Sequence, residues 1–294
     1  MSRRIQFCAG MLALVAPSLV SCAADTVIYE KVSPHNTVIV TEDQRGMRTL
    51  LFERGGTRQS VVKPGDPDHL ELAYARAALA GLALCGEPRR MLVVGLGGAT
   101  LPTFLRKYYP DAVIDIVEID PEVVDVSKRF FGFREDERMR AHVADGRRFM
   151  EGPREPYDAI FLDAYGARNV PAHLATQEFL QAVRRTLAPG GVVVGNVWRP
   201  ASNPLYGRML RTYQEVFDRV FILDVAGDVN AIFLALPREE GLGQSELAAL
   251  ARKVSAAKGF RFDLGEVVEY GFTDAKEKNP SVRVLRDADP GTLK

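Results

Sequence analysis

The stretch Met91-Leu-Val-Val-Gly95-Leu-Gly97-Gly98-Ala99-Thr100, followed by Val117-Glu118-Ile119-Asp120, decides the fold of this chain. It predicts a buried strand, a glycine turn, a helix and a second strand that ends in an acid. Glycines let the backbone approach a ligand closely, and a helix N-terminus offers free N–H groups. In nucleotide-binding units of this kind, an acid roughly 20 residues after the first glycine accepts hydrogen bonds from the ribose hydroxyls. Glu118 follows Gly95 at close to this spacing. The stretch therefore predicts a nucleoside site.

The glycine pattern alone has a second interpretation. Gly95 and Gly97 fit the start of G-x-G-x-x-G, but Thr100 stands at the third glycine. A tight strand-to-helix connection without a ligand would need the same glycines. The acid at Glu118 is what favours the nucleoside.

Composition excludes some classes of partner. The 294 residues include 38 basic and 38 acidic side chains, so no positive surface for nucleic acid is expected. The hydrophobic content of 47% is that of a globular protein. Neither the three cysteines nor the four scattered histidines show a metal-ligand spacing, so no metal is expected.

The N-terminal segment resembles a secretory leader. Arg3 and Arg4 are basic, residues 7–20 are apolar, and Ser21 and Cys22 follow. Cys22 stands where a bacterial lipobox places the lipidated cysteine, which predicts export to the periplasm and membrane anchoring. Cleavage by an ordinary signal peptidase is one alternative. An uncleaved extension of a cytoplasmic protein is the other.

Hydrophobic patterning divides the rest of the chain into three parts. Residues 25–66 alternate as short strands separated by turn residues, which predicts an antiparallel meander. Residues 67–240 start with a helix over 69–84 and continue as alternating strands and helices, which predicts a doubly wound α/β domain with a mostly parallel seven-stranded sheet. Residues 241–294 form a polar helix and a poorly patterned tail.

Ligands in such sheets bind beyond the carboxyl ends of the strands. The candidates there are Gly95–Thr100, Glu118–Asp120, Asp145 with Gly146, and Asp163–Gly166. Each acid has a structural alternative.

Asp145 can accept a hydrogen bond from an adenine amino group, or it can be a helix N-cap. Asp163 follows four apolar residues and can take a proton from an attacking amine or hold a cation. Its alternative is a turn-forming role before Gly166. Tyr165 is either an aromatic wall of the pocket or a surface ring.

Several segments resemble the spermidine synthase (polyamine aminopropyltransferase) family. They are Gly95–Pro102, Val117–Pro121, Asp145–Arg147, Tyr157–Asp163, Leu174–Leu180, Leu187–Val192, the turn Gly55–Gln59 and the tail Leu285–Pro290. The resemblance runs from about residue 26 to the end. It implies a Rossmann-like methyltransferase fold that binds S-adenosylmethionine or its decarboxylated form as co-substrate.

The resemblance also implies an activity and residue roles. Family members transfer an aminopropyl group from decarboxylated S-adenosylmethionine to a diamine, and are often dimers or tetramers. Carried over by position, Gln59, Glu118 and Asp145 hold the nucleoside, and Asp163 is the proton acceptor. Tyr74 and Tyr165 are the expected contacts of a small-molecule amine, and a homodimer is the expected assembly.

Three carboxylates of the family have no counterpart in this sequence. Gly98 stands where the family has an Asp for the amine of the donor, and Gly166 replaces the second Asp of Asp-x-x-Asp. The helix around Tyr74 also lacks the family's Glu. The sequence therefore predicts a site whose adenosine-binding half matches the family and whose acceptor-binding half differs from it. A methyltransferase that uses S-adenosylmethionine, and a non-catalytic envelope protein that binds polyamines or nucleosides, remain alternatives.

Overall fold

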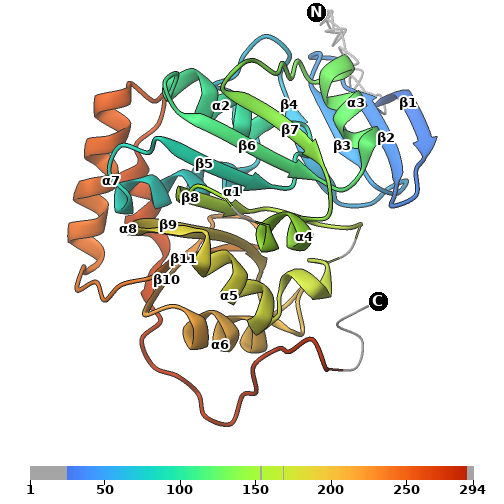
Figure 1. Cartoon of the computed structure of the whole chain (residues 1–294). Helices are drawn as coiled ribbons and strands as arrows, with labels where there is room; N and C mark the ends of the chain where they lie inside the picture. Colours follow the sequence, from blue (N-terminus) through green and yellow to red (C-terminus); the bar gives the residue numbers. More distant parts are fainter. Residues whose placement is uncertain (1–24, 153, 168, 290–294) are drawn as a thin grey trace, which may run out of the picture.

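The computed structural model describes residues 25–152, 154–167 and 169–289 (Figure 1). The leader predicted over residues 1–24, including Cys22, lies outside these ranges. No helix within them is long and apolar enough to cross a membrane.

The N-terminal residues form a small antiparallel sheet, as the alternation predicts. Its strands pair in chain order. They are β1 (Thr26–Val32), β2 (Thr37–Glu42), β3 (Arg48–Leu51) and β4 (Arg58–Val62). Val38, Val40 and Leu50 are fully buried, because one face of the sheet packs on the larger domain.

The larger domain is built on an eight-stranded sheet with the order β12-β10-β11-β9-β8-β5-β6-β7. Its strands are β5 (Arg90–Val94), β6 (Val113–Glu118), β7 (Met139–Val143), β8 (Tyr157–Leu162), β9 (Leu187–Trp198), β10 (Arg219–Asp224), β11 (Asn230–Leu236) and β12 (Phe272–Asp274). β5 to β9 pair in parallel, and β10 to β12 form the antiparallel end. The predicted doubly wound sheet is confirmed. The eighth strand comes from the tail, and its three residues are too few to show alternation.

Helices cover both faces of this sheet (Figure 1). One core joins the sheet to α1 (Ala73–Ala78), the 3₁₀ helix η1 (Leu79–Leu84), α2 (Thr100–Tyr108), α3 (Pro121–Phe130), α7 (Gln244–Lys258) and α8 (Leu264–Gly271). The second core joins it to α4 (Gly146–Glu151), η2 (Ala172–Leu174), α5 (Gln177–Arg185) and α6 (Tyr206–Val216). Apolar residues on both faces explain why the central strands are continuous hydrophobic runs.

The helix predicted over residues 69–84 is shorter and changes type. It begins at Ala73 as α1 and continues as the 3₁₀ helix η1. Within η1, a Cβ on Gly81 would lie 2.4 Å from Val194 Cγ2 of the sheet. The glycine therefore allows this segment to approach β9 closely.

The connections reverse direction beside β5, which lies between β6 and β8. The carboxyl ends of β5 and β8 meet there, and the Asp163 N–H donates to the Val94 carbonyl at 2.8 Å. Gly95 has a φ of +100°, and a Cβ on it would lie 2.4 Å from the Asp163 carbonyl oxygen. Glycine is thus required for these strand ends to approach, which places a cleft where such sheets bind ligands.

Candidate functional site

A cavity of about 350 Å³ opens at the carboxyl ends of the parallel strands. This volume lies in the range typical of small-molecule sites. Nine of the residues predicted to form the site line it together: Gln59, Tyr74, Gly95, Gly97, Glu118, Asp145, Gly146, Asp163 and Tyr165. No group of three or more His, Cys, Asp or Glu side chains in the described ranges is arranged to hold a metal ion.

Glu118 ends β6 and is 8% exposed. One carboxylate oxygen accepts the Leu96 N–H and the other accepts the Asp120 N–H, both at 3.0 Å. Burial raises the pKa of Glu118 above its usual value, and the N–H donors act in the opposite direction. Each carboxylate oxygen can accept more than one hydrogen bond, so both can still accept from ribose hydroxyls.

Asp120 has a different position from the one predicted. It is fully buried and does not line the cavity. Its carboxylate accepts the Glu122 N–H as the N-cap of α3, and it also accepts the Ser33 hydroxyl. Asp120 therefore ties the end of β6 to the loop between β1 and β2. Two residues beyond Glu118, where β6 ends, the chain has already reached the cap of the helix.

Asp145 is a helix N-cap that also lines the cavity. One carboxylate oxygen accepts the Arg148 N–H as the N-cap of α4, and the other lies 2.7 Å from His173 Nε2. Burial opposes ionisation, but these donors prevail and hold the pKa of Asp145 below its usual value. The cap interpretation is correct for the helix, and the residue also faces the cavity.

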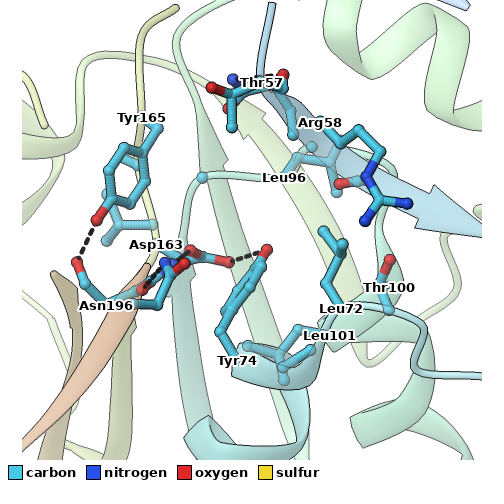
Figure 2. A pocket seen from close by; sticks show the side chains of 18 of the residues that line it. Thr57, Arg58, Leu72, Tyr74, Leu96, Thr100, Leu101, Asp163, Tyr165 and Asn196 are labelled. Carbon is cyan, nitrogen blue, oxygen red and sulfur yellow. Dashed lines mark hydrogen bonds between the residues drawn. The ribbon is translucent and has the colours of Figure 1, made fainter. Parts of the chain in front are cut away.

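Asp163 lies at the centre of a hydrogen-bonded group shown in Figure 2. Asn196 Nδ2 donates to one carboxylate oxygen at 2.8 Å, and the Tyr74 hydroxyl donates to the other at 3.3 Å. Asn230 Nδ2 donates to Asn196 Oδ1 at 2.6 Å and so fixes the orientation of that amide. Burial raises the pKa of Asp163 to about 6, because its hydrogen-bond donors are neutral and only partly offset the lost hydration.

Aromatic rings and an acid complete the wall beside Asp163. The Tyr165 hydroxyl donates to the Asn196 carbonyl at 3.0 Å, and its ring stacks on Trp198 at 5.1 Å between centroids. Asp228, in the turn between β10 and β11, lines the same cavity. Tyr165 is therefore a wall of the pocket and not a surface ring.

Gly98 packs below the cavity rather than lining it. Its N–H donates to Ser60 Oγ of β4 at 2.8 Å. A Cβ at this position would lie 2.8 Å from Ser60 Cβ and 3.2 Å from Phe131 Cδ1. The position is used to dock β4, and an Asp there would require its neighbours to move.

Several lining residues were not predicted, and the reasons differ. Asn196 lies near the carboxyl end of β9, which pairs in parallel with β8, so the strand-end rule could have found it. Asn230 begins β11, and only the antiparallel pairing of β11 with β9 brings that end to the cavity. Arg58 is the first residue of β4 and Asp228 lies in the turn between β10 and β11. A single sequence does not distinguish such charged residues from other surface residues.

The raised pKa of Asp163 predicts a pH-dependent cost to stability. The folded protein holds the proton more tightly than the unfolded chain, so Asp163 lowers stability as pH rises from about 4 to about 6. Relative to Asp163→Asn, the wild type should lose about 1–3 kcal/mol of unfolding free energy between about pH 4.5 and pH 8. Urea unfolding of both proteins at both pH values measures this. A difference between them that is independent of pH would contradict the pKa.

Comparison with known proteins identifies one family and two kinds of relative. The family model described as "Spermine/spermidine synthase domain" matches residues 72–220. A polyamine aminopropyltransferase from Vibrio vulnificus is 32% identical over 255 residues, which cover 83% of each chain. The human eEF1A lysine and N-terminal methyltransferase is 35% identical over 208 residues. These cover 64% of this chain but only 30% of that protein.

Solved structures include the same two kinds of relative. A probable spermidine synthase from Corynebacterium glutamicum aligns with a TM-score of 0.73 at 21% identity, covering 90% of this chain and 97% of that one. Human methyltransferase-like protein 13, solved in complex with SAH, aligns with a TM-score of 0.57 at 30% identity. This alignment covers 67% of this chain and 93% of that one. The first likeness establishes the fold alone.

Proposed function

Because the chain belongs to the spermine/spermidine synthase family, we propose that it transfers an alkyl group from an adenosylated sulfonium donor to an amine. The observation that carries this proposal is Asp163, a carboxyl group with a pKa of about 6 in the cavity wall. It is held in place by Asn196 and Tyr74. A group with this pKa is ionised at neutral pH. It is basic enough to take the proton that the amine nitrogen loses as it forms the new N–C bond.

The donor would occupy the side of the cavity formed by β5, β6 and β7. Glu118 is placed to accept the ribose hydroxyls, and Asp145 to accept from the adenine amino group. Gly95 and Gly97 leave space for the backbone to approach the ligand, and Gln59 closes the cavity from β4. This assignment uses the free acceptor capacity of both acids.

The reaction needs placement and a base more than covalent catalysis. The amine nitrogen attacks the carbon bound to sulfur, the N–C bond forms as the C–S bond breaks, and sulfur leaves as a neutral thioether. The excess proton on nitrogen passes to the Asp163 carboxylate. Holding nucleophile, carbon and sulfur in line supplies most of the acceleration available without a covalent intermediate.

Aminopropyl transfer is the form of the reaction favoured by the polyamine aminopropyltransferase relative, which matches over most of both chains. The acceptor site is altered, since Gly166 carries no carboxylate. Asp228 supplies an acid from another element of the same wall. Methyl transfer is the second candidate. It is favoured by the methyltransferase relatives and by the packing at Gly98, where an acid that binds an aminopropyl amine would require neighbouring side chains to move.

Incubation of the purified protein with each donor and a panel of primary amines tests the proposal. Mass spectrometry should detect an amine that has gained an aminopropyl or a methyl group, together with the matching thioether. Failure to consume either donor with any amine would contradict the proposed function.

Asp228→Asn is expected to raise KM for a diamine roughly tenfold, through loss of a charge-assisted contact to the second ammonium. KM for a monoamine of similar length should not change. The Asp228 carboxylate accepts the Val229 N–H at 2.7 Å, and asparagine can keep that bond. Asp224→Asn is the matched control, because Asp224 pairs with Arg199 and does not line the cavity. Equal shifts for both amines would contradict this role.

We also propose that Cys22 is lipidated after export, on the pattern of residues 3–22. Adenosylated donors are made in the cytoplasm, so an exported enzyme would need its donor delivered. Palmitate labelling in cells should mark the wild type and not Cys22→Ser. Equal labelling of both, or of neither, would overturn lipidation.

A further inference from the structure

One side of the cavity is lined by an exposed arginine, Arg58, that forms no ion pair with an acid in the described ranges. Arg58 begins β4 and lines the cavity, and it forms no hydrogen bond or ion pair through its side chain with another described residue. By contrast, Arg54 on the same segment is paired with Glu30. In Figure 2 the Arg58 side chain leaves β4 on the same side of the cavity as Thr100, with Tyr165 and Asn196 on the opposite side.

The neighbouring helix adds to this positive character. α2 begins at Thr100, which lines the cavity, and its first turn contains no acidic residue. The N-terminus of a helix carries a partial positive charge and favours anions. Gly98, just before it, carries no carboxylate, and an acid there would require Ser60 and Phe131 to move. Glu71, another acid in the cavity wall, lies 2.9 Å from His69 Nε2.

The proposed function gives this region its place relative to the donor. With the ribose at Glu118 and the reacting carbon facing Asp163, the remaining substituent on sulfur must extend along the glycine loop. That loop and Thr100 lead toward Arg58. The tail of the donor would therefore end in a positively charged region, where an ammonium without a carboxylate is repelled and a carboxylate is attracted.

Building on the proposed function, we infer that Arg58 binds the carboxylate of the donor, and that the donor is S-adenosylmethionine rather than its decarboxylated form. The group transferred is then the methyl group. The N–C bond forms as the bond from sulfur to methyl breaks, and sulfur keeps the electron pair as S-adenosylhomocysteine. The proton from the amine passes to Asp163.

Titration calorimetry with three ligands tests this inference. S-adenosylhomocysteine carries the carboxylate and the ammonium, its decarboxylated form carries the ammonium alone, and 5′-methylthioadenosine carries neither. The wild type should bind S-adenosylhomocysteine most tightly and the decarboxylated form least tightly. Arg58→Gln should weaken the binding of S-adenosylhomocysteine about tenfold to a hundredfold and leave the affinity for 5′-methylthioadenosine unchanged.

The controls separate this inference from the proposed function. Arg54→Gln removes a nearby positive charge outside the cavity wall and should leave all three affinities unchanged. Tighter binding of the decarboxylated ligand by the wild type, or equal weakening of all three ligands by Arg58→Gln, would overturn the role of Arg58 while leaving the adenosine site intact. Failure of all three ligands to bind the wild type would overturn the proposed function and this inference with it.

Discussion

Asp163→Asn is expected to lower kcat by about 10²–10⁴-fold while changing donor affinity little. The substitution keeps the size of the side chain but removes the group that accepts the proton from the amine. In the wild type, kcat/KM should also fall below about pH 6, because protonated Asp163 cannot act as a base. Initial rates across pH, with calorimetry of S-adenosylhomocysteine, measure both effects.

Two variants keep this prediction specific. Asp218→Asn changes an acid that pairs with Arg184 outside the cavity wall, and it should leave kcat unchanged. Tyr74→Phe removes one hydrogen bond to the Asp163 carboxylate, which should move the acidic limb of kcat/KM to higher pH. An Asp163→Asn protein with wild-type kcat would refute the role assigned to the carboxylate.

Glu118→Gln is expected to weaken binding of the adenosine half of the donor by about a hundredfold. The wild-type carboxylate can accept from two ribose hydroxyls, and hydrogen bonds to a charged group contribute about 1.5–3 kcal/mol each. The variant should still turn over at saturating donor, since Glu118 does not contact the reacting atoms. Calorimetry with 5′-methylthioadenosine gives the affinity.

A ligand without the ribose hydroxyls separates binding from structural damage. Glu118 also accepts the Leu96 and Asp120 N–H groups, so its substitution perturbs the loop. The wild type should bind the 2′,3′-dideoxy form of 5′-methylthioadenosine much more weakly than the parent compound. Glu118→Gln should discriminate little between the two. Discrimination equal to that of the wild type would show that the hydroxyls bind elsewhere.

The strand ends were predictable because one geometric rule governs them. Parallel strands point the same way, so Gly95, Glu118, Asp145 and Asp163 were expected at one edge of the sheet, and all four line one cavity. The rule does not hold for residues that lie beyond the strand end, at the start of the next helix. Asp120 follows the same strand as Glu118 but is directed away as a helix cap.

The sequence did not reveal which residues of antiparallel strands and of surface turns contribute to the cavity wall. Asn230 reaches the cavity only because β11 runs against β9, and a hydrophobic run does not reveal its direction. Arg58 is the first residue of β4, directly after a polar turn, and the hydrogen bond between Gly98 and Ser60 of the same strand holds β4 against the cavity wall. The sequence also does not reveal that Gly98 packs closely against Ser60 of β4.

The central claim is that this cavity binds the adenosine half of a sulfonium donor. Titration of the wild-type protein with 5′-methylthioadenosine, the part that both candidate donors share, tests it most directly. The account predicts one molecule bound per chain and displaced by S-adenosylhomocysteine. A titration with no saturable binding, on protein shown to be folded, would contradict it.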